Sequence, residues 1–122
     1  MIEVICDTSF LIHLVTKKIK NLDSINVEIG EFQYTIPLVV LDELERLSKI
    51  PDKEQDIRKT LEFAHTLKIV PISGKIADDA ITEHIKKYGG IVATIDKELK
   101  NKIKNLGGSI MSFSNDKIVL ES

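Results

Sequence analysis

The sequence has few of the residues on which thiol and imidazole sites depend. The single cysteine, Cys6, cannot form an internal disulfide, and without a second thiol it cannot build a thiolate metal centre. A lone cysteine of this kind usually packs as a small buried residue. The three histidines, His13, His65 and His84, are scattered over predicted helices and form no pair at ligand spacing. A zinc site is therefore not expected.

Long apolar runs are also absent. No segment approaches the ~20 consecutive apolar residues that span a bilayer. The first residues, MIEVICDTS, lack the charged leader and the small-residue cleavage site of a secretory signal. We therefore expect a cytoplasmic protein that makes no membrane contact.

What the sequence does contain is typical of an ordinary globular protein. Its 122 residues, of which 43% are hydrophobic and 30% are charged, fit a single domain spanning residues 1–122. The net charge of −2 gives no overall attraction for nucleic acid. Binding to nucleic acid would therefore depend on local basic patches, or on cations that neutralise clustered acids.

Short apolar runs alternate along the chain with segments of helical spacing. Strands are predicted at 2–6, 69–73, 91–95 and 109–113, with a short final strand at 117–120. Helices are predicted at 9–19, 38–49, 52–67, 75–88 and 97–105, and the stretch 21–33 is predicted to be a loop with one turn of helix. This alternation predicts an α/β fold in which helices cover both faces of a parallel sheet.

Two acids follow predicted strands directly. Asp7 comes after strand 2–6 and Asp96 after strand 91–95. In parallel sheets, ligands bind beyond the carboxyl ends of the strands, so both residues are candidates for a site there. The alternative is that each caps the helix that follows it, because Asp is a favoured N-cap residue.

Helical spacing separates two adjacent acids on predicted helix 75–88. Asp78 lies three residues before Ile81 and seven before Ile85, which assigns it to the buried face. Its place near the helix N-terminus also favours a negative charge. Asp79 belongs to the polar face and is expected to point to solvent or to help cap the helix.

Glu43 is the acid that fits its surroundings least well. On predicted helix 38–49 it lies between Val40 and Leu47 on the apolar face, whereas Asp42 lies on the polar face. A carboxylate on a buried face is unfavourable unless it is paired or bound to a cation. The alternative is a boundary residue whose side chain reaches outward to solvent.

A shared cation would explain why acids from four distant segments point to the same edge of one sheet. Carboxylate oxygens are the preferred ligands of Mg²⁺ and Mn²⁺. We therefore expect Asp7, Glu43, Asp78 and Asp96 to form one Mg²⁺ or Mn²⁺ site.

Four segments resemble, in order and spacing, the motifs of PIN-domain nucleases: CDTSFLI, LDELERL, ADDAI and TIDKEL. The resemblance covers essentially the whole chain. It implies a three-layer α/β/α sandwich with a central, mainly parallel sheet. It also implies that the four acids named above bind Mg²⁺ or Mn²⁺ and hydrolyse the phosphodiester bonds of RNA.

The resemblance further implies supporting residues near the four acids. Ser9 matches a small polar residue that supports the site, and Thr94 matches the hydroxyl residue two positions before the fourth acid. Glu98 stands where some relatives carry a further Asp, and Asp79 adjoins the third acid. Lysines on one face of helix 97–105 are predicted to hold RNA, with a solvated helix face as the alternative: Lys97, Lys100 and Lys104.

The sequence thus predicts a metal-dependent endoribonuclease. The family includes VapC-type toxins, which are often homodimers neutralised by an antitoxin, and nucleases that trim ribosomal RNA, which implies a ribosome-assembly partner. The segments LDELERL and DDAI resemble the ribosomal-RNA-processing nucleases of the family more than its toxins. The main alternative is a catalytically silent PIN scaffold that binds RNA or a protein partner.

Two other α/β classes that place an Asp after the first strand fit less well. Haloacid-dehalogenase phosphatases need a second Asp two residues later, where this chain has Ser9. Phosphoacceptor receiver domains need an acidic pair before the phosphorylated Asp, whereas Glu3 is the sole acid of the first strand.

Overall fold

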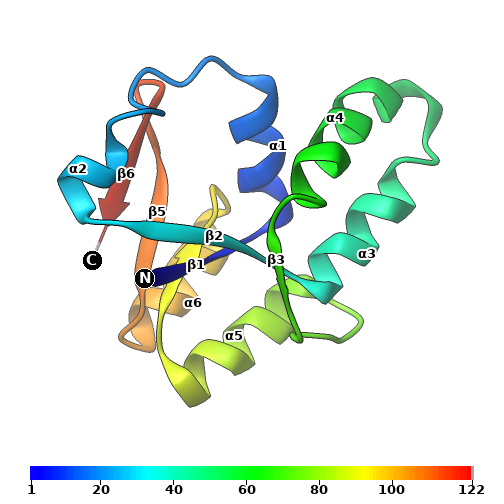
Figure 1. Ribbon diagram of the computed structural model, residues 1–122. Helices are drawn as coiled ribbons and strands as arrows, with labels where there is room; N and C mark the ends of the chain where they lie inside the picture. The colour runs from blue at the N-terminus through cyan, green and yellow to red at the C-terminus, as the bar shows by residue number, and fades with distance from the viewer. Residues whose placement is uncertain (122) are drawn as a thin grey trace.

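The computed structural model describes residues 1–121, which contain six strands in one sheet (Figure 1). In chain order the strands are β1 (Ile2–Cys6), β2 (Phe32–Pro37), β3 (Lys68–Val70), β4 (Ile91–Ala93), β5 (Ser109–Ser114) and β6 (Lys117–Glu121). In space they follow the order β3-β2-β1-β4-β5-β6, and every neighbouring pair is parallel except β5 and β6. The predicted mainly parallel sheet is confirmed.

Helices cover both faces of this sheet, so the predicted three-layer α/β/α arrangement is also confirmed (Figure 1). One face carries α1 (Thr8–Thr16), α3 (Leu38–Leu47) and α4 (Glu54–Ala64). The other carries α5 (Ala77–Tyr88) and α6 (Lys97–Asn105). Two short elements complete the set, α2 (Ile25–Ile29) and the 3₁₀ turn η1 (Pro51–Lys53).

The chain changes direction across the sheet at β1. It first runs from β1 outward to β2 and β3, and then returns to pair β4 with the other side of β1. Because crossovers between parallel strands are right-handed, this reversal sends the later helices to the opposite face. The topological switch point, where open α/β sheets bind ligands, therefore lies at the carboxyl ends of β1 and β4.

Strand β2 lies partly inside the stretch that the sequence pattern assigned to a loop. Its aromatic and β-branched residues suit a strand, and Thr35 and Ile36 are fully buried. Pro37 ends the strand and forms the N-cap of α3. Proline is tolerated there because no further sheet hydrogen bond has to be donated.

Two strands are shorter than predicted. Strand β3 stops at Val70 because Pro71 cannot donate to the sheet, so the predicted strand 69–73 is wrong at both ends. Strand β4 stops at Ala93, although the backbone N–H of Thr94 still donates a hydrogen bond of 3.0 Å to the carbonyl oxygen of Met111. Two residues therefore separate β4 from Asp96.

The buried apolar side chains form one cluster around the sheet. Cys6 is fully buried, as predicted, and burial raises the pKa of its thiol far above the ordinary value. The chain turns sharply between β5 and β6 at Asn115 and Asp116, both with positive φ, as in tight hairpin turns. In the described part of the chain, no helix is long and apolar enough to cross a membrane.

Candidate active site

A cleft of about 480 Å³ opens at the switch point, and the four predicted acids line it. Asp7 follows β1, Glu43 lies in α3, Asp78 lies in the first turn of α5, and Asp96 is the N-cap of α6. The fold thus brings carboxylates from four separate elements to one cavity. The side chains beside them are mostly apolar or hydroxylic: Thr8, Ser9, Ile12, Leu47, Ile76, Ala77 and Leu99.

Asp7 is held by groups that carry no net charge. Its Oδ1 accepts a hydrogen bond from the backbone N–H of Thr8 (2.8 Å), and its Oδ2 accepts from the hydroxyls of Ser9 (3.2 Å) and Thr94 (2.9 Å). Burial nevertheless raises the pKa of the Asp7 carboxyl, and the nearby Glu43 carboxylate adds to this rise. The carboxylate is oriented firmly, but its charge is not neutralised.

Thr94 connects the first acid with the fourth. While its hydroxyl donates to Asp7, its oxygen accepts a hydrogen bond from the backbone N–H of Asp96 at 3.1 Å. Thr94 is fully buried, so this bridge is shielded from water. The hydroxyl residue identified from the fourth motif is therefore a structural link between the two strand ends.

Asp96 caps α6, which agrees with the alternative considered for it from the sequence. Its Oδ1 accepts from the backbone N–H groups of Glu98 (2.8 Å) and Leu99 (3.2 Å). Asp7 likewise caps α1. Capping does not exclude a ligand site, because Asp96 engages its helix through Oδ1 alone and the residue still lines the cleft. The Glu98 side chain is exposed and is not part of the lining.

Glu43 reaches the cleft from α3 and is only partly buried. The buried Thr8 donates its hydroxyl to Glu43 Oε2 at 3.2 Å and so joins α3 to the start of α1. Sequence reasoning did not single out Thr8, although its place directly after Asp7 offered a signal. Asp42, on the other side of the helix, is exposed.

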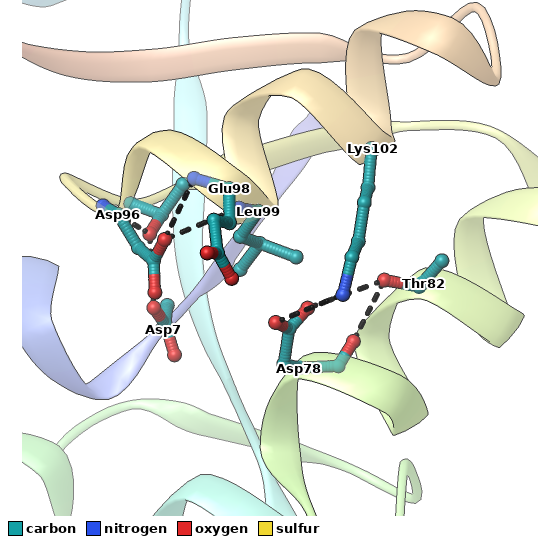
Figure 2. A network of polar contacts seen from close by, with 8 residues as sticks. Asp7, Asp78, Thr82, Asp96, Glu98, Leu99 and Lys102 are labelled. Atoms are coloured by element: carbon teal, nitrogen blue, oxygen red, sulfur yellow. Dashed lines mark hydrogen bonds and ion pairs between the residues drawn. The ribbon is translucent and has the colours of Figure 1, made fainter.

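Asp78 differs from the other acids because a lysine neutralises it. Lys102 Nζ lies 3.3 Å from Asp78 Oδ2, and Thr82 Oγ1 lies 3.5 Å from Oδ1 (Figure 2). The figure shows the Lys102 side chain descending from α6 to the carboxylate on α5. Asp79 is exposed and lines a separate hollow beside Gly74, outside the acidic cleft.

The predicted RNA-binding lysines of α6 have different surroundings. Lys97 is exposed, whereas Lys100 and Lys104 lie 3.2 and 3.5 Å from the carboxylate of Glu121 in β6. Lys100 in particular lowers the pKa of Glu121. Sequence reasoning missed Lys102, which pairs with Asp78 of α5. It also missed Lys53 of η1, which lines the cleft.

The donor set fits a hard divalent cation in chemistry, but it is not a closed cage. Over residues 1–121, no three carboxylate, imidazole or thiol groups lie near enough to one another to enclose a metal ion. Like charges repel, and Mg²⁺ commonly takes one or two carboxylates and reaches the rest through water. A cleft with four carboxylates, in which the half-buried Asp7 has no compensating cation, suits such binding.

A larger hollow, of about 650 Å³, runs along η1 and α4. Both acids and bases line it, and Arg58 forms an ion pair with Glu54. Its acids thus lie among bases, whereas the cleft at the switch point brings together four acids.

Comparison with known proteins agrees with this geometry. A family model described as "PIN like domain" matches residues 4–115, a span that includes all four acids. Among solved structures, the chain is similar to "Structure of the PIN domain endonuclease Utp24", with a TM-score of 0.81 and 29% identity over 98% of this chain and 90% of that one. A search of curated proteins found no match. Since the family model spans most of the sequence, this chain belongs to the PIN-like domain family.

Proposed function

We propose that this protein is a metal-dependent endoribonuclease. The observation that carries the proposal is the convergence of four carboxylates on one cleft at the switch point of the sheet. Within residues 1–121, no ion pair neutralises Asp7, so its half-buried charge is available to a cation. The similarity to a solved PIN domain endonuclease supports nuclease chemistry.

The residues of the cleft would divide the work between holding a cation and orienting water. Asp7, Asp78 and Asp96 hold Mg²⁺ or Mn²⁺, directly or through water, and Glu43 completes the shell or orients the attacking water. Thr8 fixes the Glu43 carboxylate for this task, and Thr94 fixes that of Asp7. When bound, the cation supplies a water of lowered pKa and offsets charge on the phosphoryl oxygens.

RNA would approach the cleft along lysines. We propose contacts to backbone phosphates from Lys97, Lys100 and Lys104, of which the last two keep partly exposed side chains beside Glu121. Lys53 lines the cleft itself and is a further candidate. Phosphate contacts of this kind give affinity without sequence preference.

The reaction predicts specific products. Water attacks phosphorus, the bond to O3′ breaks, and the products carry a 5′-phosphate and a 3′-hydroxyl. The described part of the chain offers no histidine beside the acids to activate the 2′-hydroxyl of RNA instead. RNA with a 2′-deoxy substitution at the scissile nucleotide should therefore still be cleaved, at the same or a lower rate.

Mass spectrometry of products from a short single-stranded RNA tests the proposal. We expect 5′-phosphate ends in the presence of Mn²⁺ or Mg²⁺, and no cleavage with EDTA. A 2′,3′-cyclic phosphate, or activity that survives EDTA, would show that the acids do not perform the assigned chemistry.

A silent scaffold is the second candidate, and one observation favours it. The ammonium of Lys102 neutralises Asp78, and the four acids do not form a closed cage among residues 1–121. A scaffold would bind RNA with the same affinity in EDTA and in Mn²⁺ and would leave the RNA intact. The product assay above separates the two candidates.

A further inference from the structure

Lys102 pairs with an acid of the cleft, and neither the capping of the helices nor the proposed chemistry explains this pair. Its Nζ lies 3.3 Å from Asp78 Oδ2, and the two residues are 24 positions apart in sequence. The pair joins α6 to α5, the two helices that carry the fourth and third acids. Over residues 1–121, no lysine or arginine forms an ion pair with Asp7, Glu43 or Asp96, although Lys53 lines the same cleft.

The Lys102 ammonium would compete with a metal ion for the Asp78 carboxylate. Asp78 has one oxygen facing Lys102 and the other facing the Thr82 hydroxyl. The Asp78 side chain is 28% exposed and that of Lys102 is 47% exposed, so the pair can open without unpacking the core. A cation that uses Asp78 must displace the ammonium or share the carboxylate with it, and like charges at that distance repel.

We infer that Lys102 is a positioning residue that restrains metal binding, because its ammonium pairs with Asp78 and a metal ion at Asp78 would have to displace it. This inference rests on the proposed metal site. The ion pair orients the Asp78 carboxylate and links α6 to α5. Metal binding then requires exchange at Asp78, whereas Asp7, Glu43 and Asp96 need no such exchange.

Mn²⁺ affinity, measured by isothermal titration calorimetry, tests the inference without any use of activity. Lys102→Met keeps the apolar stem and removes the ammonium, so Mn²⁺ should bind about fivefold more tightly, the factor that corresponds to a surface ion pair. Lys102→Arg restores a cation that pairs well with carboxylates and should bind Mn²⁺ no more tightly than wild type. Lys86→Met, an exposed lysine on α5, is the control for lost charge alone.

The outcomes separate the inference from the proposed function. Tighter binding by Lys102→Met, with Lys102→Arg and Lys86→Met near wild type, supports the restraint. If wild type binds Mn²⁺ and needs Asp7 and Asp96, but Lys102→Met binds equally or less tightly, the restraint is wrong and the metal site stands. If Lys86→Met gains as much as Lys102→Met, net charge is the cause and the restraint is again wrong. If neither wild type nor any variant binds Mn²⁺, the proposed metal site fails and the inference fails with it. Circular dichroism and melting of each variant confirm that it is folded.

Discussion

Within residues 1–121, on the β1 side of the cleft, Asp7 and Glu43 receive hydrogen bonds only from hydroxyl and amide groups, whereas on the α5 side Asp78 lies beside the ammonium of Lys102. Hydroxyl and amide donors orient a carboxylate but leave its charge in place, and burial of that charge is unfavourable. A lysine both orients a carboxylate and neutralises its charge. Under the proposed function, the β1 side would therefore receive the metal cation, whereas the α5 side already has the ammonium of Lys102.

The largest effect on cleavage should come from removing the acid on the α5 side of the cleft. Asp78→Asn removes a carboxylate from the cleft and should lower the rate of RNA cleavage at least about 100-fold. The reason is that a correctly held metal ion lowers the activation barrier by several kcal/mol. Asp79→Asn, one position away but exposed outside the cleft, is the matched control and should retain most activity. Single-turnover rates of the two variants decide the point.

The reverse result for these two variants would move the third acid to Asp79. The nuclease proposal would survive it, but the assignment of helix faces in α5 would not.

A smaller loss should follow when the β1 side is loosened without loss of charge. Thr94→Val removes the hydroxyl that donates to Asp7 and accepts from the Asp96 N–H. Removal of such a supporting group usually lowers activity or metal affinity about 10- to 100-fold. Thr66→Val, at an exposed hydroxyl bonded to the Phe63 carbonyl, serves as the comparison. Unchanged Mn²⁺ affinity and cleavage in Thr94→Val would mean that Asp7 is held adequately by Thr8 and Ser9.

The sequence allowed much of this site to be placed, because its signals are local. Helical period alone separated the partly buried Asp78 from the exposed Asp79. The positions of Asp7 and Asp96 after apolar runs led to the carboxyl edge of the sheet. Local pattern also predicted five of the six strands, and it missed β2, where a loop-like stretch and Pro37 hide a central strand.

What the sequence did not reveal depends on approach between distant segments. Thr8 meets Glu43 across 35 positions, and Thr94 meets Asp7 across 87. The pairing of Glu121 with lysines of α6 likewise depends on how β6 returns along β5. Side-chain period and propensity report which way a residue faces, but not which partner the fold brings to it.

The uncompensated charge of Asp7 also gives a stability effect with a definite pH dependence. The pKa of this carboxyl is raised above its ordinary value of 3.8. A raised folded-state pKa means that stability is greatest below the unfolded-state pKa and declines as pH rises through the folded-state value. Asp7→Asn removes that decline, so in EDTA at neutral pH the variant should melt a few degrees above wild type. The difference should shrink as the pH falls toward 3.8.

Melting curves in EDTA across this pH range check the expectation. A variant that is less stable than wild type at neutral pH would show that the hydrogen bonds to Asp7 outweigh the penalty of burying its charge.

The smallest effect concerns the partly exposed ion pairs of Glu121, which lie outside the cleft lining. Glu121→Gln removes the partner of Lys100 and Lys104 and should lower the free energy of unfolding by at most about 1 kcal/mol, because ion pairs that solvent still reaches contribute little. Since Lys100 holds the pKa of Glu121 below its ordinary 4.5, this contribution is present above that pH and fades as pH falls through the lowered value. Urea unfolding at two pH values measures it, and a larger loss would give β6 a greater structural role.

The central claim, that the four acids share one cation, is tested most directly by thermal melting in increasing Mn²⁺. A ligand that binds the native state adds RT ln(1 + [L]/Kd), about 2.7 kcal/mol at one hundred times Kd, so the melting temperature of wild type should climb steadily. An Asp7→Asn/Asp96→Asn variant lacks two of the four carboxylates and should not respond. If Mn²⁺ leaves the wild-type melting temperature unchanged, or shifts the double variant equally, the shared metal site is contradicted.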